Sequence, residues 1–524
     1  METISKGKVI IIGGGLSGLT AGVYLKKFGF DVEILEKNLN VGGLCTCWTR
    51  KGSLIDGCIH WLTESDYGEL NDVMKEIGAL GDNVPVHHFD TYIQTYVNNK
   101  VVKFPMEYDQ LQKELLKYAK GNDKKKICTL IKHIKSCRRD LLSPGKPYWN
   151  WNVWDKIKFF FRVIPFVPVM KYGQDIDLAD FANSLESEEL RFFFANTILP
   201  RDYSMFSFCY TMGGICAHNS GVPHGGSATF AERIANKFVG LGGVVTTRAE
   251  VKRVLVDENT ATGVEMMDGS VKNADFIVSA CDIFYSLENL FENRFKVKIL
   301  EDAKQKTKCF KPFSIFLLSF RTDKDLSQLP VHTFYQCEEY EVLGQKEKSL
   351  YIKHFSYDDT FVHDGKTLVQ YVLETDDIVF ERLSKMTPEE YKQFKQDFAA
   401  KITDLIGKYG QDNFGELEFL DLVTPLTFPK WTHSYRGSFM TYKLSKKNRQ
   451  FILRNDVLPL RNVALAGNWL MIPGGVPVAI QQGKFAAHTI EYQREHIDSF
   501  DVEKAKKKLD IPLKSIKNEN VFTR

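Results

Sequence analysis

The sequence has no long hydrophobic run near its start and no excess of charge of one sign. Its first apolar run extends only from Val9 to Ile12, far too short for a secretory signal or a membrane span. We therefore expect a cytoplasmic protein. The 524 residues include 69 basic and 66 acidic side chains, for a net charge of +3. This balance argues against nucleic acid as a partner.

The sequence also lacks the spacings that mark metal sites and hydrolases. Its ten cysteines are scattered, and the closest pair, Cys45 and Cys47, has no second pair at zinc-finger distance. We interpret them as reduced thiols. There is no G-x-S-x-G elbow and no H-E-x-x-H motif. The sequence therefore gives no support to a hydrolase or a metalloenzyme, and we predict no metal site.

A strand–glycine–helix pattern stands near the start. Residues 8 to 12 predict a buried parallel strand, the next residues a helix, and residues 32 to 36 a second strand. Between the first strand and the helix lies a G-x-G-x-x-G motif, residues 13 to 18. Gly13 permits the tight turn, Gly15 lets a pyrophosphate approach the backbone, and Gly18 lets the helix pack closely. The phosphates would lie at the positive end of the helix.

An acidic residue completes this pattern. Glu36 ends the second strand, where a carboxylate can accept hydrogen bonds from ribose hydroxyls and would repel a 2'-phosphate. An ordinary glycine turn is the alternative, but strand, helix and acid together favour a dinucleotide. The residues predicted to contact it here are Gly13, Gly15, Leu16, Ser17, Gly18, Glu36 and Lys37. These residues alone do not distinguish FAD from NAD.

Two further stretches favour a flavin. Gly42 and Gly43 follow the acid and offer a second close backbone approach, which suits a cofactor that extends past its pyrophosphate. Near the C-terminus, residues 462 to 477 predict a strand, a polar break, a glycine pair and a helix. The start of that helix can direct unpaired N–H groups at the negative charge of a reduced flavin. The further contacts predicted in these two stretches are Leu44, Gly467, Asn468, Gly475 and Val476.

These motifs resemble those of phytoene desaturases, carotenoid isomerases and retinol saturases in the flavin-dependent amine oxidase superfamily. The resemblance covers most of residues 8 to 72 and 220 to 490, and its motifs include the double glycine, the stretch from Asp56 to Trp61, the region 274 to 280 and the ending from Ala466 to Pro477. It implies that His60 and Trp61 also contact the cofactor. It departs at Leu44, where a basic residue is common, and at Asn468, which replaces the usual acid. The resemblance implies FAD as cofactor, with Val251 packing against adenine. It also implies an apolar isoprenoid, carotenoid, retinoid or lipid substrate.

The predicted fold is α/β, with an interleaved Rossmann-type FAD-binding domain and an antiparallel-sheet substrate domain. Strands are expected at 312–320, 349–355 and 367–373, and helices at 230–241, 388–408 and 476–493. We assign 1–72, 220–285 and 455–495 to FAD binding, and 73–219 and 286–454 to the substrate. A helical insertion occupies about 110–200, and 496–524 is predicted to be a C-terminal tail that is polar from about residue 504.

The segment from residue 147 to 169 mixes tryptophan, phenylalanine and flanking cations, and it follows a basic stretch from 117 to 146. This composition suits a membrane surface that carries anionic lipid. A buried aromatic core beside a solvated basic helix is the alternative.

Catalytic residues are harder to predict, because a flavin carries the redox chemistry itself. His60 could move a proton or hold a substrate oxygen, although a structural role is the alternative. No second dinucleotide motif opens a helix, so an external electron donor or acceptor is expected. The leading hypothesis is an FAD-dependent oxidoreductase that desaturates, saturates or isomerises a carbon–carbon bond. A flavin amine oxidase and a flavin-binding protein without turnover are the alternatives.

Overall fold

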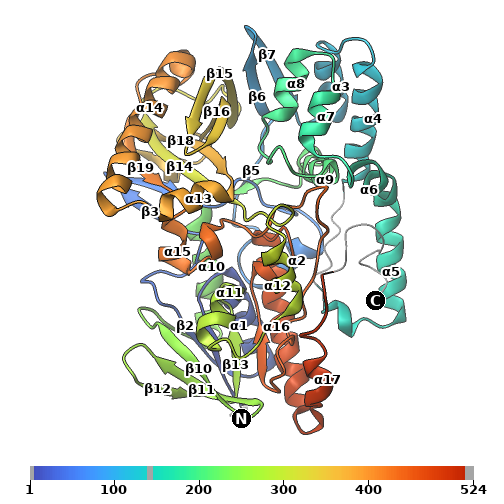
Figure 1. Cartoon of the computed structure of the whole chain (residues 1–524), viewed down its shortest axis with the longest axis vertical. Helices are drawn as coiled ribbons and strands as arrows, with labels where there is room; N and C mark the ends of the chain where they lie inside the picture. Colours follow the sequence, from blue (N-terminus) through green and yellow to red (C-terminus); the bar gives the residue numbers. More distant parts are fainter. Residues whose placement is uncertain (1–4, 139–144, 514–524) are drawn as a thin grey trace.

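The computed structural model describes residues 5–138 and 145–513, and its lower part in Figure 1 is built on a parallel sheet. All neighbouring strands in this sheet are parallel. They come from the beginning, the middle and the end of the chain, which confirms the predicted interleaved α/β fold. In spatial order they are β20 (Val463–Leu465), β13 (Phe276–Ser279), β1 (Lys8–Ile12), β2 (Asp31–Leu35) and β9 (Val244–Thr246).

Both faces of this sheet are buried, which explains why its strands are almost continuously apolar. On β1, Val9 and Ile11 pack toward one face, whereas Ile10 and Ile12 pack toward the other. The first face is covered by α1 (Leu16–Phe28), α10 (Gly226–Gly240) and α16 (Val476–Glu495).

The opposite face carries a small antiparallel sheet and short helices, which share its core. These elements are β10 (Val251–Asp257), β11 (Thr260–Met266), β12 (Val271–Asn273), α11 (Ile283–Tyr285), η3 (Ser286–Leu290) and α12 (Lys298–Gln305).

A second, larger sheet forms the upper left of Figure 1. It is antiparallel as predicted, except that β15 and β6 run parallel, because β6 enters from an earlier part of the chain. In order its strands are β19 (Glu418–Val423), β14 (Ser314–Thr322), β18 (Lys366–Thr375), β16 (Gln345–His354), β15 (His332–Val342), β6 (Thr91–Val97) and β7 (Lys100–Pro105), and β17 (Val362–His363) pairs with β18.

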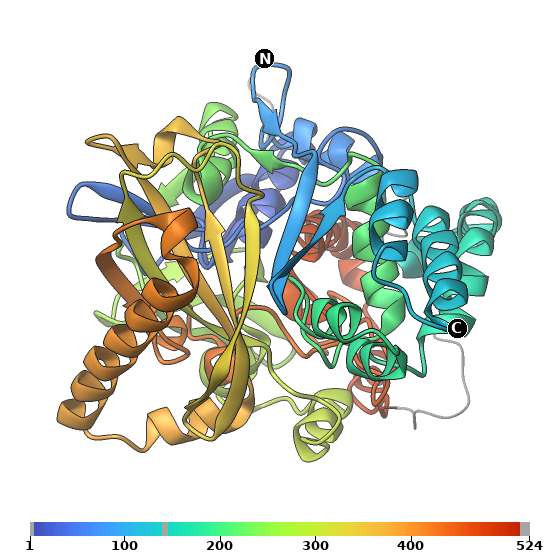
Figure 2. The ribbon, with the colours of Figure 1, turned by 90° about the horizontal axis from the view of Figure 1, so that it is seen from above.

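Helix α14 (Pro388–Phe414) covers one face of the second sheet, through Phe398 and Ile402. It begins at the predicted proline and extends past the predicted end at residue 408. Figure 2 shows α14 outside the sheet and the helical region beyond β6 and β7. The elements that connect these parts are β3 (Cys47–Arg50), β4 (Ser53–Asp56), β5 (Val86–His87), β8 (Val222–Pro223), η4 (Asp359–Phe361), α13 (Asp377–Ser384), α15 (Thr427–Thr432), η5 (Tyr435–Gly437) and η6 (Asn468–Leu470).

The predicted insertion is helical, and most of its helices bury an apolar face in one common core. Within the described residues, no helix is long and apolar enough to cross a membrane. The helices from residue 69 to 216 are α2 (Glu69–Glu76), α3 (Tyr108–Leu116), α4 (Asp123–Ser136), η1 (Tyr148–Asn150), α5 (Val153–Val163), η2 (Ile164–Phe166), α6 (Val167–Gly173), α7 (Leu178–Ser184), α8 (Glu188–Ala195) and α9 (Met205–Cys216).

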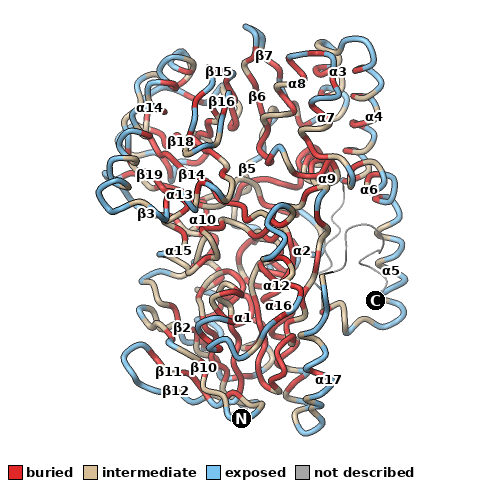
Figure 3. The backbone as a smooth tube through the Cα atoms, in the orientation of Figure 1, coloured by how far each residue is buried: buried red, intermediate tan, exposed pale blue. Residues whose placement is uncertain are grey.

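Helix α5 and the short η1 before it are exceptions, because none of their residues is buried. Figure 3 shows α5 as an exposed segment at the edge of the molecule. Trp154, Phe160 and Phe161 are 71%, 64% and 66% exposed. The interpretation as a buried aromatic core is therefore wrong along α5, whereas Phe166 and Val169 at the end of the same segment are buried.

The prediction of a polar tail from residue 504 is also wrong for residues 504–513. Residues after η7 (Ile497–Ser499) form α17 (Val502–Lys506), where Ala505 is buried. Leu509 and Leu513 pack against the core between the two sheets of the lower domain, and Lys508 pairs with Asp456 at 2.6 Å. The apolar positions among the lysines explain why the segment docks. Residues 514–524 lie outside the described residues.

Candidate cofactor and substrate site

The glycine-rich stretches from the two ends of the chain line one cavity of about 1170 Å³. Small-molecule sites usually measure ~300–1,000 Å³, so this cavity has room for a second ligand beside a cofactor. The predicted residues that line it are Gly13, Gly15, Leu16, Ser17, Glu36, Lys37, Gly42, Gly43, Leu44, His60, Trp61, Val251, Gly467, Asn468, Gly475 and Val476. Gly18 lies behind this lining.

The N-terminal glycines have different surroundings. A β-carbon on Gly18 would lie 2.0 Å from the carbonyl oxygen of Gly13, so only glycine lets the helix pack against the loop. At Gly15 the nearest protein atoms to such a carbon would be 4.0 Å away. The space beside Gly15 therefore belongs to the cavity, at the start of α1. Its position suits a phosphate, because the first N–H groups of a helix are unpaired and attract anions.

Glu36 joins the two glycine motifs of the N-terminal half. It is buried at the end of β2, and one carboxylate oxygen accepts a hydrogen bond from the Gly14 N–H at 2.8 Å. The other oxygen accepts from the backbone and the side chain of Asn38, both at 2.8 Å. The oxygen that accepts from Gly14 has a further lone pair, so the carboxylate remains able to accept from a ribose hydroxyl. Gly42 is held against this loop through its N–H, which donates to the carbonyl oxygen of Gly14 at 2.8 Å.

The C-terminal half reaches the same cavity through α16. Gly475 precedes this helix with φ +90°, a conformation that favours glycine. The Ser17 hydroxyl on α1 donates to the carbonyl oxygen of Ala479 on α16 at 2.6 Å. Two helix N-termini therefore begin at one cavity, which fits a dinucleotide that carries negative charge at both its phosphates and its reduced ring.

Another polar group in the lining was not predicted. Lys37 lies 3.1 Å from the Nε2 atom of His433, and that atom lies 3.0 Å from Glu250. The His433 ring stacks on Tyr285, with centroids 4.0 Å apart. Tyr285 ends α11 and His433 follows α15, and no spacing in the sequence links them to the glycine motif.

His60 lines the cavity as a partly buried and uncharged side chain. Burial, together with the charge of Lys353, lowers the pKa of His60 well below its usual value of 6.5. In the part of the chain that the structure describes, its Nδ1 atom has no hydrogen-bond partner. Lys353 lies behind it and donates to the carbonyl oxygen of Ile59 at 3.0 Å. His60 therefore offers a neutral imidazole to a ligand.

The second sheet supplies an apolar wall. Ile315 on β14 and Val372 on β18 face the cavity together with Phe313, Tyr351 and Phe439. Ile315, Val372 and Tyr351 come from neighbouring strands, Phe313 directly precedes β14, and Phe439 lies in the loop after η5.

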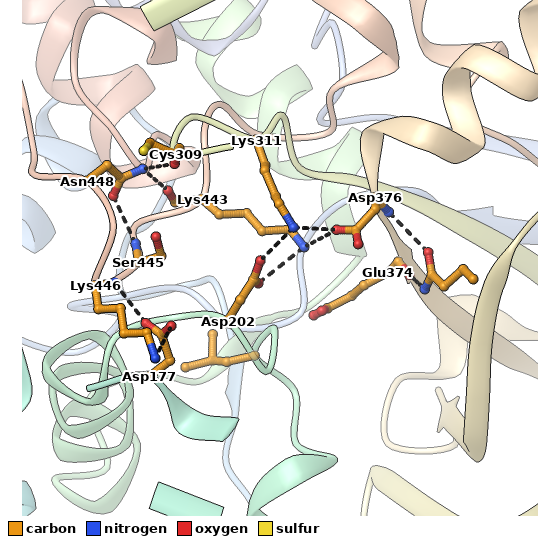
Figure 4. A network of polar contacts seen from close by, with 12 residues as sticks. Asp177, Asp202, Cys309, Lys311, Glu374, Asp376, Lys443, Ser445, Lys446 and Asn448 are labelled. Carbon is orange, nitrogen blue, oxygen red and sulfur yellow. Dashed lines mark hydrogen bonds and ion pairs between the residues drawn. The ribbon is translucent and has the colours of Figure 1, made fainter. Parts of the chain in front are cut away.

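One carboxyl group interrupts this apolar wall. Burial raises the pKa of Glu374 to about 8. Figure 4 shows Glu374 beside a network in which Lys443 lies 3.3 Å from both Asp202 and Asp376. Lys311 lies 3.9 Å and 3.8 Å from the same two carboxylates. Both lysines are paired with these two aspartates. Glu374, whose pKa is raised to about 8, therefore faces the cavity mainly as a neutral acid at pH 7.

Comparisons with known proteins agree with this geometry. The family model described as flavin containing amine oxidoreductase matches residues 16–490. The chain is 28% identical over 307 residues to inactive all-trans-retinol 13,14-reductase of Danio rerio, covering 54% of this chain and 48% of that protein. It is 22% identical over 512 residues to 4,4'-diapophytoene desaturase (4,4'-diapolycopene-forming) of Methylomonas sp, covering 92% and 94%. A solved oxidoreductase from Methanosarcina mazei shares the fold, with a TM-score of 0.57, 16% identity and coverage of 93% and 100%.

The first prediction concerns the space beside Gly15. Gly15→Ala should leave the protein folded without cofactor, because no protein atom lies closer than 4.0 Å to the added carbon. It should weaken FAD binding by about tenfold or more, equivalent to ~1.4 kcal/mol, because the methyl group enters the space left for the phosphates. Flavin fluorescence titration of the apoprotein measures the change. Gly240→Ala, which also has open space around it, is the control. Equal FAD affinity in both variants would contradict the assignment.

The second prediction concerns pH. Glu374 stays protonated in the folded protein up to about pH 8, whereas its ordinary pKa is 4.5. Its contribution to stability is therefore fully present below pH 4.5 and is lost as the pH rises toward 8. Glu374→Gln stays neutral, so its melting temperature should fall less than that of the parent protein between pH 5 and 8. If the melting temperatures of the parent protein and of Glu374→Gln fell equally between pH 5 and 8, this account would be refuted. Glu416→Gln, which changes an exposed residue, is the control.

Proposed function

This chain belongs to the family of flavin containing amine oxidoreductases, and on that premise we propose that it acts on a carbon–carbon bond of an apolar isoprenoid or lipid substrate. It is an FAD-dependent oxidoreductase. When bound, FAD supplies the transfer of two electrons. The relatives named for a retinol and for a diapophytoene support an apolar polyene as substrate. Desaturation, saturation and isomerisation all remain within the proposal.

The observation that carries this proposal is the apolar wall opposite the glycine loops. Ile315, Val372 and Phe313 would exclude water from the reacting carbons and bind hydrocarbon. His60 would accept a hydrogen bond from a substrate oxygen through its neutral ring. An amine substrate is less well matched, because Glu374 is mainly a neutral acid near pH 7 and offers little negative charge to an ammonium group.

Helix α5 supports a route for such a substrate from a membrane surface. Its Phe159, Phe160 and Val163 line the cavity, while Trp154 and Phe161 are exposed. One helix therefore separates the cavity from solvent and presents aromatic rings outward. Lys156 and Lys158 on the same helix could attract anionic lipid.

The third prediction tests the reaction. FAD-loaded protein is mixed with carotenes, retinoids, unsaturated fatty acids or amines. The flavin is either left oxidised, with quinone or oxygen as the electron acceptor, or reduced beforehand with dithionite. We expect turnover of an apolar polyene, detected as a shift of its absorption bands. Val372→Arg should reduce kcat/KM by about 100-fold, or ~2.7 kcal/mol, because it places a charge in the apolar wall. The flavin spectrum of this variant should be unchanged.

Two outcomes would overturn the proposal. Turnover of an amine alone would identify an amine oxidase. A flavin that is bleached by dithionite but exchanges electrons with none of these compounds would identify a flavin-binding protein without turnover.

The fourth prediction tests membrane contact. The protein should sediment with vesicles that contain anionic lipid, and Trp154→Ser with Phe160→Ser and Phe161→Ser should weaken binding by about tenfold or more, because exposed aromatic area is lost. Met267→Ser removes an apolar side chain that is 62% exposed on another surface, and it should have no effect. Equal sedimentation of the triple variant and the Met267 control would exclude α5 as the contact.

A further inference from the structure

Two histidines and an aspartate from distant segments meet outside the cofactor cavity. His87 ends β5, His224 follows β8, and Asp358 lies in the loop after β16. The Nε2 atom of His87 lies 3.7 Å from one oxygen of Asp358, and the Nδ1 atom of His224 lies 3.3 Å from the other. One nitrogen of each histidine and one carboxylate oxygen all lie within 4.8 Å of one another.

These groups are the donors that zinc prefers in proteins. Zinc binds neutral imidazole and carboxylate at ~2.0–2.2 Å in a tetrahedral arrangement, so its ligand atoms are about 3.4 Å apart. The separations of 3.3 Å and 3.7 Å, which end on the two different oxygens of Asp358, are close to that value, and one ligand atom from each residue lies within 4.8 Å of the others. The Nε2 atom of His87 is buried and, within the described parts of the chain, has no hydrogen-bond partner. A buried nitrogen without a partner is costly, and a metal ion would satisfy it.

The surroundings fix these groups in place. The fully buried Asp358 carboxylate accepts from the Gly225 N–H at 2.8 Å and from the N–H and hydroxyl of Thr360 at 3.0 Å and 2.6 Å. The second ring nitrogen of His224 lies 3.7 Å from Asp359. A metal-binding histidine usually gives its other N–H to a carboxylate, and Asp359 is the nearby carboxylate for this role, although 3.7 Å is longer than a hydrogen bond. Arg233 donates to the carbonyl oxygen of His224 at 2.8 Å and so holds the same turn.

We infer that His87, His224 and Asp358 form a structural zinc site. The site links β5 and the loop after β16 to the turn that begins α10. At the start of α10, Ser227 donates from its N–H at 2.7 Å and from its hydroxyl at 2.8 Å to Asp56, just before the cavity-lining segment 58–61. Bound zinc therefore stabilises the turn at the start of α10. Through Ser227 and Asp56, this turn holds the cavity-lining segment 58–61 in place. The inference does not depend on the proposed substrate.

The experiment uses full-length, FAD-loaded protein without a histidine tag, first treated with a chelator. Zinc chloride is titrated in competition with a fluorescent zinc indicator, and bound metal is counted by elemental analysis. We expect one zinc ion per chain. His87→Gln and His224→Gln should each weaken binding by about 100-fold or more, because each removes one of three protein ligands. Zinc should raise the melting temperature of the parent protein but not of these variants.

His363→Gln is the matched control, because His363 lies 3.2 Å from a single carboxylate, Asp364, on the surface. It should bind zinc like the parent protein. Retained flavin absorption shows that each variant is folded. Parent protein that binds no zinc, or His87 and His224 variants that bind it like the His363 control, would overturn the inference. Neither result would depend on turnover, so both are separate from a failure of the proposed function.

Discussion

The close contact between α1 and α16 holds the two ends of the chain together. A β-carbon on Gly483 of α16 would lie 2.4 Å from the carbonyl oxygen of Ser17 on α1, so only glycine allows this approach. Ser17 also bonds to Ala479 one turn earlier on α16. Because both helices begin at the cavity, the contact sets the distance between the glycine loop and Gly475. The cofactor site therefore depends on packing between segments separated by most of the sequence.

The cavity is bordered by groups kept neutral or paired. His60 loses its proton readily because it is buried near Lys353, and Glu374 keeps its proton because burial opposes its charge. The lysines beside Glu374 are matched by Asp202 and Asp376. An unpaired charge at this wall would cost several kcal/mol in the absence of a partner. This arrangement is compatible with the apolar substrate that we propose, although ionisable residues stand in the cavity wall.

Local patterns in the sequence predicted individual strands, helices and glycine turns. Buried strands such as Val9 to Ile12 and the helix after Gly475 were recognised because their apolar period and glycine turns lie within a few residues. The parallel pairing of β15 with β6 was missed, since it joins distant segments. Composition likewise could not place α5, because aromatic residues suit a core and an exposed surface equally. His433 and the cluster of His87, His224 and Asp358 carry no spacing signal, because only the folded chain brings them together.

The segment from Asp56 to His60 shows why the two domains act as one unit. From the cofactor domain, Ser227 donates to the Asp56 carboxylate. From the second sheet, Gln370 donates to the Asp56 carbonyl oxygen at 2.8 Å, and Lys353 donates to Ile59 at 3.0 Å. A shift of the substrate sheet must therefore move the backbone beside His60 or break buried hydrogen bonds, each of which costs ~1–3 kcal/mol when a partner is lost. The segment from Asp56 to Ile59 is thus held by hydrogen bonds from both parts of the molecule.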